Sequence, residues 1–138
     1  MQDINARPIR LTSVLSMTID GDTQRIEEAF IGTLKQHNAT FLLAYDEPEN
    51  KGRTLAKVAP TSLVINRQGN TSTILRFTLG QREQAHYQTA EGLLNLGTET
   101  SQLLVETNSK GGKVVVDYIL YINGQHASNN RLTLNWTL

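Results

Sequence analysis

Apolar and polar residues alternate with a period of two along most of this chain, and no other feature constrains the fold as strongly. Between Ile9 and Asp20, most apolar side chains fall on one parity and most polar ones on the other. Successive side chains of a β-strand point to opposite faces, so this pattern is typical of strands with one buried face. The last hairpin shows it most clearly, with alternate residues from Val114 to Ile122 apolar before the turn Asn123-Gly124.

The alternation predicts about ten strands joined mostly by short turns. The predicted segments are residues 9–20, 24–36, 41–45, 54–58, 61–66, 71–79, 83–89, 93–100, 102–107, 114–122 and 132–136. Residues 48–53 contain a proline and a glycine and are predicted to form a surface loop. An open sheet of this size would leave two edges and one bare apolar face. We therefore predict an all-β, single-domain chain (residues 1–138) that forms a closed antiparallel barrel of about 8–10 strands.

Composition excludes several classes of partner. Thirteen basic residues balance thirteen acidic ones, so no net field attracts nucleic acid or an anionic membrane. The eight aromatic residues form no stripe with basic residues of the kind that stacks single-stranded bases. No apolar run approaches the roughly 20 residues that span a bilayer. The beginning of the chain has no apolar leader, so we expect a cytoplasmic protein without nucleic-acid or membrane partners.

No motif in the sequence predicts catalysis, a metal or a cofactor. The chain has no cysteine, and His37, His86 and His126 match no metal-binding spacing. Asp20-Gly21-Asp22 begins like a calcium loop, but the following ligands are missing, so a hairpin turn is predicted. Neither a phosphate-binding glycine loop nor a nucleophile elbow is present. A non-enzymatic role is therefore favoured over an enzymatic one.

Polar residues at positions that should point into the barrel are the candidate ligand contacts. They are Tyr45, Glu47, Lys57, Arg67, Tyr87, Thr89 and Tyr118. Glu28 occupies a similar position between Ile26 and Phe30. A charge inside a barrel is costly unless it is paired, so interior carboxylates and cations should meet.

Two interpretations of these residues are open. In the first, Glu28 or Glu47 pairs with Arg67 or Lys57 as a buried structural plug, with tyrosine hydroxyls satisfying the remaining acceptors. In the second, the residues line a barrel mouth that binds a small anionic or hydroxylated molecule, because arginine suits carboxylates and phosphates. A register error of one residue would turn all these side chains outward.

Apolar residues also occupy positions that are predicted to face outward from the barrel. They are Val14, Ile31, Val115, Ile119 and Tyr121. If the last hairpin closes the barrel beside the first, these residues form a patch on the outer wall. The alternative function is therefore a protein-interaction module that forms a homodimer through this wall.

Several short motifs resemble the YwiB-like family of uncharacterised bacterial proteins. The matching pieces are Tyr45-Asp46-Glu47, Arg67-Gln68-Gly69, Phe77 with Gly80, Tyr87-Gln88-Thr89 with Gly92, Tyr118-Ile119-Leu120 and Ile122-Asn123-Gly124. Their order and spacing cover about two-thirds of the chain, from Phe41 onward. The resemblance implies a calycin-type (lipocalin-like) β-barrel in an intracellular setting and lends no activity.

Overall fold

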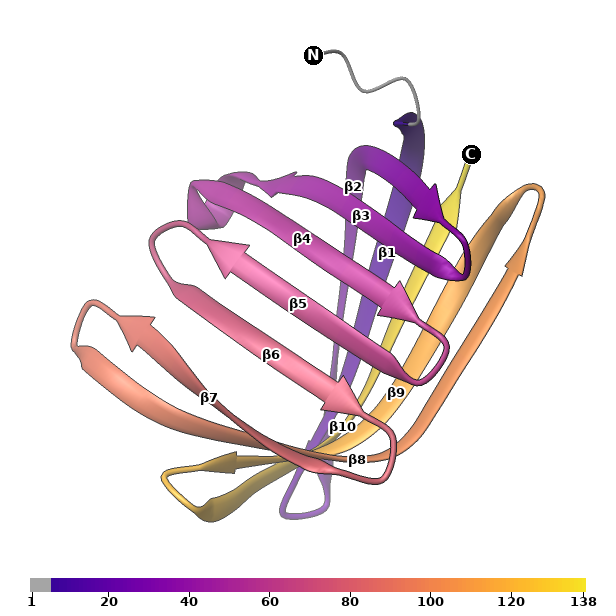
Figure 1. Cartoon of the computed structure of the whole chain (residues 1–138). Coiled ribbons are helices and arrows are strands. Elements are labelled where there is room, and N and C mark those ends of the chain that lie inside the picture. The colour runs from indigo at the N-terminus through magenta and orange to yellow at the C-terminus, as the bar shows by residue number, and fades with distance from the viewer. Residues whose placement is uncertain (1–5) are drawn as a thin grey trace.

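Ten antiparallel strands close into one barrel in the computed structural model of the chain, which describes residues 6–138 (Figure 1). Each strand pairs with the next one along the chain, and β1 pairs with β10 to complete the ring. The strands are β1 (Arg7–Ile19), β2 (Asp22–His37), β3 (Thr40–Glu47), β4 (Gly52–Ala59), β5 (Ser62–Gln68), β6 (Ser72–Thr78), β7 (Arg82–Thr89), β8 (Gly92–Asn108), β9 (Gly111–Ile122) and β10 (Gln125–Thr137). The predicted fold class is confirmed. Within the described part of the chain, no helix is long and apolar enough to cross a membrane.

The loop predicted between β3 and β4 contains a single 3-10 turn, Pro48–Asn50. The strand break predicted at residue 101 was wrong: residues 93–100 and 102–107 form one continuous strand, β8, with a register shift between Thr100 and Gln102. The extra residue of a β-bulge shifts the inward parity by one. Even-numbered Thr100 and odd-numbered Leu103 therefore both lie buried.

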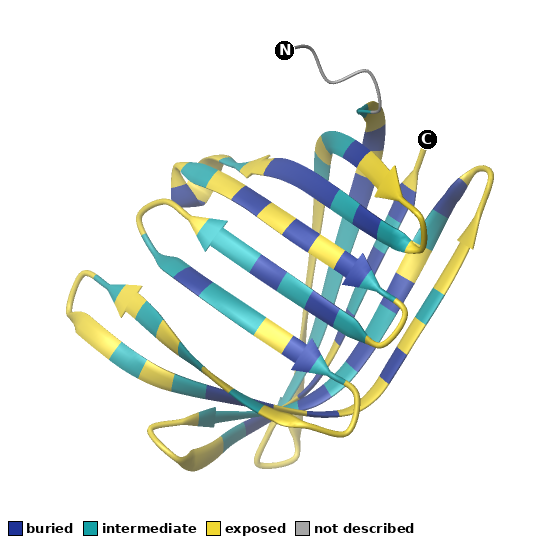
Figure 2. Cartoon of the chain, viewed as in Figure 1, coloured by how far each residue is buried: buried dark blue, intermediate teal, exposed yellow. Residues whose placement is uncertain are grey.

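The apolar parity of each strand faces the interior. Figure 2 shows buried and exposed segments alternating along β4 and other strands of the barrel wall. Leu11, Val116 and Leu134 are almost fully buried, and Leu75 packs against the same core. On β4 the predicted parity was wrong, because Ala56 and Val58 face inward and Leu55 faces solvent.

The two ends of the barrel differ in how fully they are packed. On β2, Leu34 is buried whereas Ile26, eight residues earlier on the same inner face, is nearly half exposed. On β1, Ile9 is buried and Ile19 is exposed in the same way. We call the end that carries the turns after β1, β3, β5, β7 and β9 the open end, and the opposite one the filled end.

Strands β6 and β7 are joined by fewer residue pairs than any other neighbours in the barrel. Only Ser72 and Thr73 pair with β7, opposite Gln88 and Tyr87. Two threonine hydroxyls supply hydrogen bonds where the strand pairing is missing. Thr73 Oγ1 of β6 donates to the His86 carbonyl of β7 at 3.2 Å, and Thr98 Oγ1 of β8 donates to the Arg76 carbonyl of β6 at 2.6 Å. We call this junction the seam.

Candidate functional site

An ion pair between Glu47 and Arg67 lies on the inner face at the open end. Glu47 ends β3, and Arg67 is next to last in β5, so both follow inward-facing apolar residues of their strands. Arg67 Nε donates to Glu47 Oε2 at 2.9 Å and Nη2 donates to Oε1 at 3.4 Å. The fully buried Thr54, on the strand between them, donates to Glu47 Oε2 at 2.5 Å. Of the pairings that the sequence left open between Glu28 or Glu47 and Arg67 or Lys57, the one that forms is Glu47 with Arg67.

This pair is not a fully buried plug. The side chain of Arg67 is 34% exposed and that of Glu47 is 13% exposed. Water therefore reaches the guanidinium and screens the pair, which limits its contribution to stability. The arrangement leaves part of the guanidinium accessible from the open end.

Tyr45 lies beside this pair and is kept neutral by its surroundings. Burial raises the pKa of its hydroxyl, the carboxylates of Glu47 and Glu28 raise it further, and Arg67 partly opposes the rise. Its ring packs against Phe30 with 4.8 Å between centroids. The hydrogen bond expected from a tyrosine to Glu47 comes instead from Thr54.

A cavity of about 400 Å³ opens next to the ion pair. Its lining residues are Glu28, Ala29, Phe30, Glu47, Pro48, Glu49, Asn50 and Arg67. Three carboxylates and one guanidinium thus line the cavity, and that guanidinium is already paired with Glu47. The local charge disfavours a negatively charged ligand in this cavity.

The other predicted contacts divide between the inner and outer faces. Tyr87 and Thr89 lie half-buried on the inner parity of β7, and Thr89 Oγ1 donates to the Gly92 carbonyl at 2.8 Å. Tyr118 faces inward from β9, and its ring lies 4.6 Å from that of Phe77. Burial raises the pKa of the Tyr118 hydroxyl to about 12.

Lys57 does not face inward. It lies exposed on the outer face of β4, because the neighbouring Thr54, Ala56 and Val58 take the inward parity. Sequence parity misled here because the inward-facing Thr54 is polar and the outward-facing Leu55 is apolar. The prediction that Lys57 lines the barrel interior was wrong.

Three buried polar atoms on the opposite wall were missed by the sequence analysis. Thr100 Oγ1, Ser128 Oγ and Asn130 Oδ1 have no hydrogen-bond partner within residues 6–138. Tyr118 lies between two of them, directly opposite Thr100 on β8 and Asn130 on β10. Native proteins satisfy almost all buried polar groups, so each such atom requires an explanation. The sequence signal that could have identified them is a polar residue at an inward-facing position where the alternation otherwise places apolar residues.

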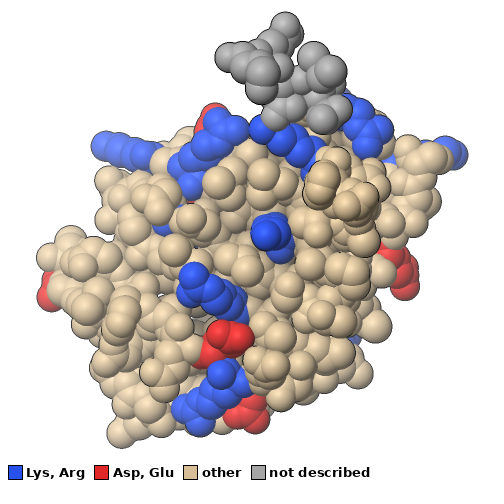
Figure 3. Space-filling model, viewed as in Figure 1, with Lys and Arg blue, Asp and Glu red and all other residues tan. Residues whose placement is uncertain are grey.

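On the face in Figure 3, basic side chains gather along the upper edge of the view, and lower on the same face basic and acidic groups lie next to one another. Within residues 6–138, no group of three or more histidine, aspartate or glutamate side chains is placed to hold a metal ion.

Comparison with known proteins identifies the family but no activity. The model of a family described as a domain of unknown function, DUF1934, matches residues 9–134. The fold is similar to the crystal structure of the ywiB protein from Bacillus subtilis, with a TM-score of 0.86 and 21% sequence identity over 96% of this chain and 92% of that one. No curated protein sequence matches the chain. The YwiB-like resemblance is confirmed.

Proposed function

We propose, on the premise that the chain belongs to the DUF1934 family of domains of unknown function, that the open end of its barrel binds a small hydroxylated molecule. The role is binding and not catalysis. Arg67, Glu47, Tyr87, Thr89 and Tyr118 are the proposed contacts, with Tyr45 as a buried support.

The observation that carries this proposal is the difference between the two barrel ends. The inner face is closely packed at the filled end, whereas a cavity of about 400 Å³ lies at the open end beside a partly exposed ion pair. Ligand sites are usually concave, with a few polar groups on an apolar frame. This cavity has that character.

The chemical class of the ligand follows from the charged groups that line the cavity. Arg67 is neutralised by Glu47, and Glu28 and Glu49 add further negative charge, so an uncharged or cationic molecule suits the cavity better than an anion. A hydroxyl group both donates and accepts hydrogen bonds, so an uncharged hydroxylated molecule can pair with the carboxylates and with the exposed part of the Arg67 guanidinium.

Amide NMR spectra of the protein titrated with myo-inositol test this proposal, and a separate titration with putrescine, a diamine without hydroxyl groups, distinguishes a site for hydroxyl groups from a site for cations. We expect shifts at the amides of residues near Glu28, Glu47 and Arg67. Arg67→Ala should weaken binding about tenfold or more, because it removes a charged hydrogen-bond donor. Arg53→Ala, on the outer face of β4, is the matched control and should bind as the unaltered protein does.

Stability separates binding from a purely structural plug. Because Arg67 is about one-third exposed, Arg67→Ala should lower the melting temperature by only about 3–4 °C, roughly 1 kcal/mol. A much larger fall, together with no response to either probe, would favour the plug interpretation and overturn the proposed function.

A second candidate is homodimerisation through the outer wall. Val14, Thr133, Val115 and Leu104 stand in register across β1, β10, β9 and β8. Leu104 is 58% exposed, although it is apolar. These four side chains form a continuous strip of low polarity on the outer wall. Ile31, Ile119 and Tyr121 lie outside this strip.

Light scattering at micromolar concentration tests the dimer. The proposal predicts a dimeric mass for the unaltered protein and a monomeric mass for Leu104→Glu, which places a charge on the strip. A monomeric mass for the unaltered protein would exclude this candidate.

A further inference from the structure

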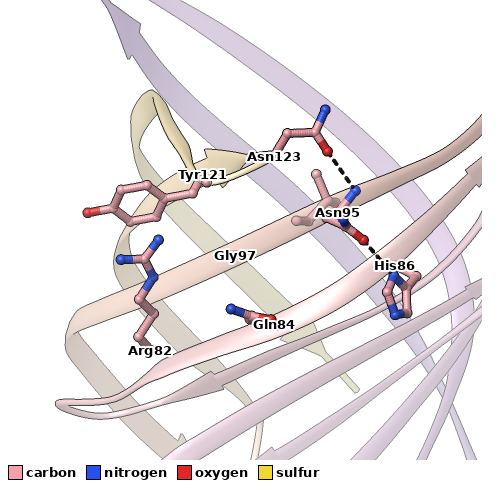
Figure 4. Close-up of a pocket in the computed structure, with 9 residues that line it drawn as sticks. Arg82, Gln84, His86, Asn95, Gly97, Tyr121 and Asn123 are labelled. Atoms are coloured by element: carbon pink, nitrogen blue, oxygen red, sulfur yellow. Dashed lines mark hydrogen bonds between the residues drawn. The ribbon is translucent and has the colours of Figure 1, made fainter.

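A second hollow of about 580 Å³ lies on the outer face of the barrel, over β7, β8 and the β9–β10 turn (Figure 4). Arg82, Gln84 and His86 alternate along β7 and therefore all face outward. Tyr121 and Asn123 border the hollow on the other side. We call it the outer groove.

The groove exists because the residue at its centre has no side chain. Gly97 of β8 stands in register with Gln84 on one side and with Tyr121 on the other. Any other residue at this position would project its side chain between those two. Figure 4 shows Gly97 on its strand with Arg82, Gln84 and Tyr121 around it, and the residue is buried beneath these side chains.

The fold itself does not require a glycine at position 97. Its φ is not positive, and an added Cβ would approach no atom closer than 3.4 Å, which is ordinary van der Waals contact. Each of the other nine glycines has a positive φ or would bring a Cβ within 3.0 Å of another atom. A glycine inside a strand weakens that strand, and such a glycine often marks a place where a ligand approaches the backbone.

The side chains around the groove present mostly unused hydrogen-bond donors. Asn95 Oδ1 can only accept, so the His86 Nδ1 that lies 2.9 Å away carries the proton. Asn123 Oδ1 accepts from the Asn95 backbone N–H at 3.2 Å. Both asparagine carbonyl groups are therefore occupied, while their amide NH₂ groups have no partner within residues 6–138.

Arg82 supplies the positive charge of the groove. Its guanidinium lies 3.8 Å from the centroid of the Tyr121 ring, which fixes its position by a cation–π contact. Glu99 stands opposite Arg82 in register but accepts a hydrogen bond from the Tyr121 hydroxyl at 3.3 Å. Within the described residues, no carboxylate lies within ion-pair distance of Arg82, in contrast to Arg67 at the open end.

We propose that the outer groove is a binding site for a small anion with a carboxylate or phosphate group, which Arg82 and the amide donors of Gln84, Asn95 and Asn123 hold in the space that a side chain at position 97 would narrow. The site is separate from the open end and does not depend on the function proposed there. The two sites are also electrostatically distinct, because carboxylates dominate the cavity at the open end.

Amide NMR titration with inorganic phosphate and, separately, with citrate tests this site and distinguishes the two anion groups. We expect saturable shifts in the millimolar range, at the amides of residues 82–86, 95–97 and 121–123. Arg82→Gln should weaken binding about tenfold or more, and Arg53→Gln should leave it unchanged. Glu99→Gln should strengthen binding, because it removes a negative charge that stands in register with Arg82.

Gly97→Val gives the decisive comparison. A β-branched side chain fills the groove and favours the strand, so this variant should keep or raise the melting temperature while losing the response to both anions. A marked fall in melting temperature would show that the glycine serves the fold, and would overturn the argument. Unchanged binding in Gly97→Val, or no shifts in the unaltered protein with either anion, would also overturn it.

Discussion

Tyr118 is a residue whose buried position predicts a loss of stability at alkaline pH. Burial raises the pKa of its hydroxyl from 10.0 to about 12. Between these values the unfolded chain releases a proton that the folded protein keeps, so the free energy of unfolding falls as the pH rises from 10 to 12. Below pH 10 the contribution of the Tyr118 hydroxyl to the free energy of unfolding is fully present.

Urea unfolding at several pH values across this range tests the prediction. Tyr118→Phe keeps the ring contact with Phe77 and should make the alkaline loss of stability smaller. Some loss should remain, since the pKa of Tyr45 is also raised. Tyr121→Phe, on the outer face, is the control; an equal effect from it would contradict the assignment to Tyr118.

Individual residues also show where sequence reasoning succeeded. An ion pair between an inward carboxylate and an inward cation was predicted because opposite charges inside a barrel have to compensate each other, and Glu47 with Arg67 is the pair that forms. Lys57 was misplaced because parity on β4 depends on Thr54, whose inward position is favoured by its hydrogen bond to Glu47. That contact joins residues on two strands, so no pattern within β4 could indicate it.

At the scale of elements, the seam between β6 and β7 depends on side-chain hydroxyls. The buried Thr98 donates to the Arg76 carbonyl in place of a strand partner. Thr98→Val preserves the shape but leaves that carbonyl unpaired, so we expect a loss of about 1–3 kcal/mol in the free energy of unfolding. Thr133→Val, half-exposed on the outer face of β10, should change it by less than about 0.5 kcal/mol. Equal effects in urea unfolding would show that the Thr98 hydroxyl adds nothing to the seam.

Most strands were predictable because their alternation is local, whereas the bulge in β8 was not. The change of parity between Leu96 and Leu103 looks in sequence like the end of one strand and the start of another. In the barrel, β9 pairs with residues on both sides of Ser101, and this long-range pairing keeps β8 continuous. The outer groove was missed for a similar reason, because Gly97 acquires its meaning only from Gln84 and Tyr121 on neighbouring strands.

For the whole molecule, closure of the barrel and filling of its interior are separate properties. Alternation predicted closure, since every strand has one apolar parity. It could not predict which end is filled, because Ile9, Ile19, Ile26 and Leu34 are all apolar and all face inward. Their different exposure follows from which large side chains meet across the interior, such as Phe41 and Trp136 at the filled end, with 5.8 Å between their ring centroids.

This asymmetry predicts unequal costs for two truncations on one strand. Leu34 is 2% exposed and Ile26 is 45% exposed, although both lie on the inner face of β2. Leu34→Ala should lower the free energy of unfolding by about 2–5 kcal/mol, because it removes buried contacts and leaves a void at the filled end. Ile26→Ala removes a side chain that water already reaches, so we expect a loss below about 1 kcal/mol.

Urea unfolding, followed by the fluorescence of Trp136, measures both losses, because this single tryptophan is buried at the filled end. A small loss for Leu34→Ala would mean that the filled end is loosely packed in solution. A loss for Ile26→Ala as large as that for Leu34→Ala would mean that the open end is closed in solution. The cavity beside Glu47 and Arg67 would then lack an entrance, and the binding proposed there would fail with it.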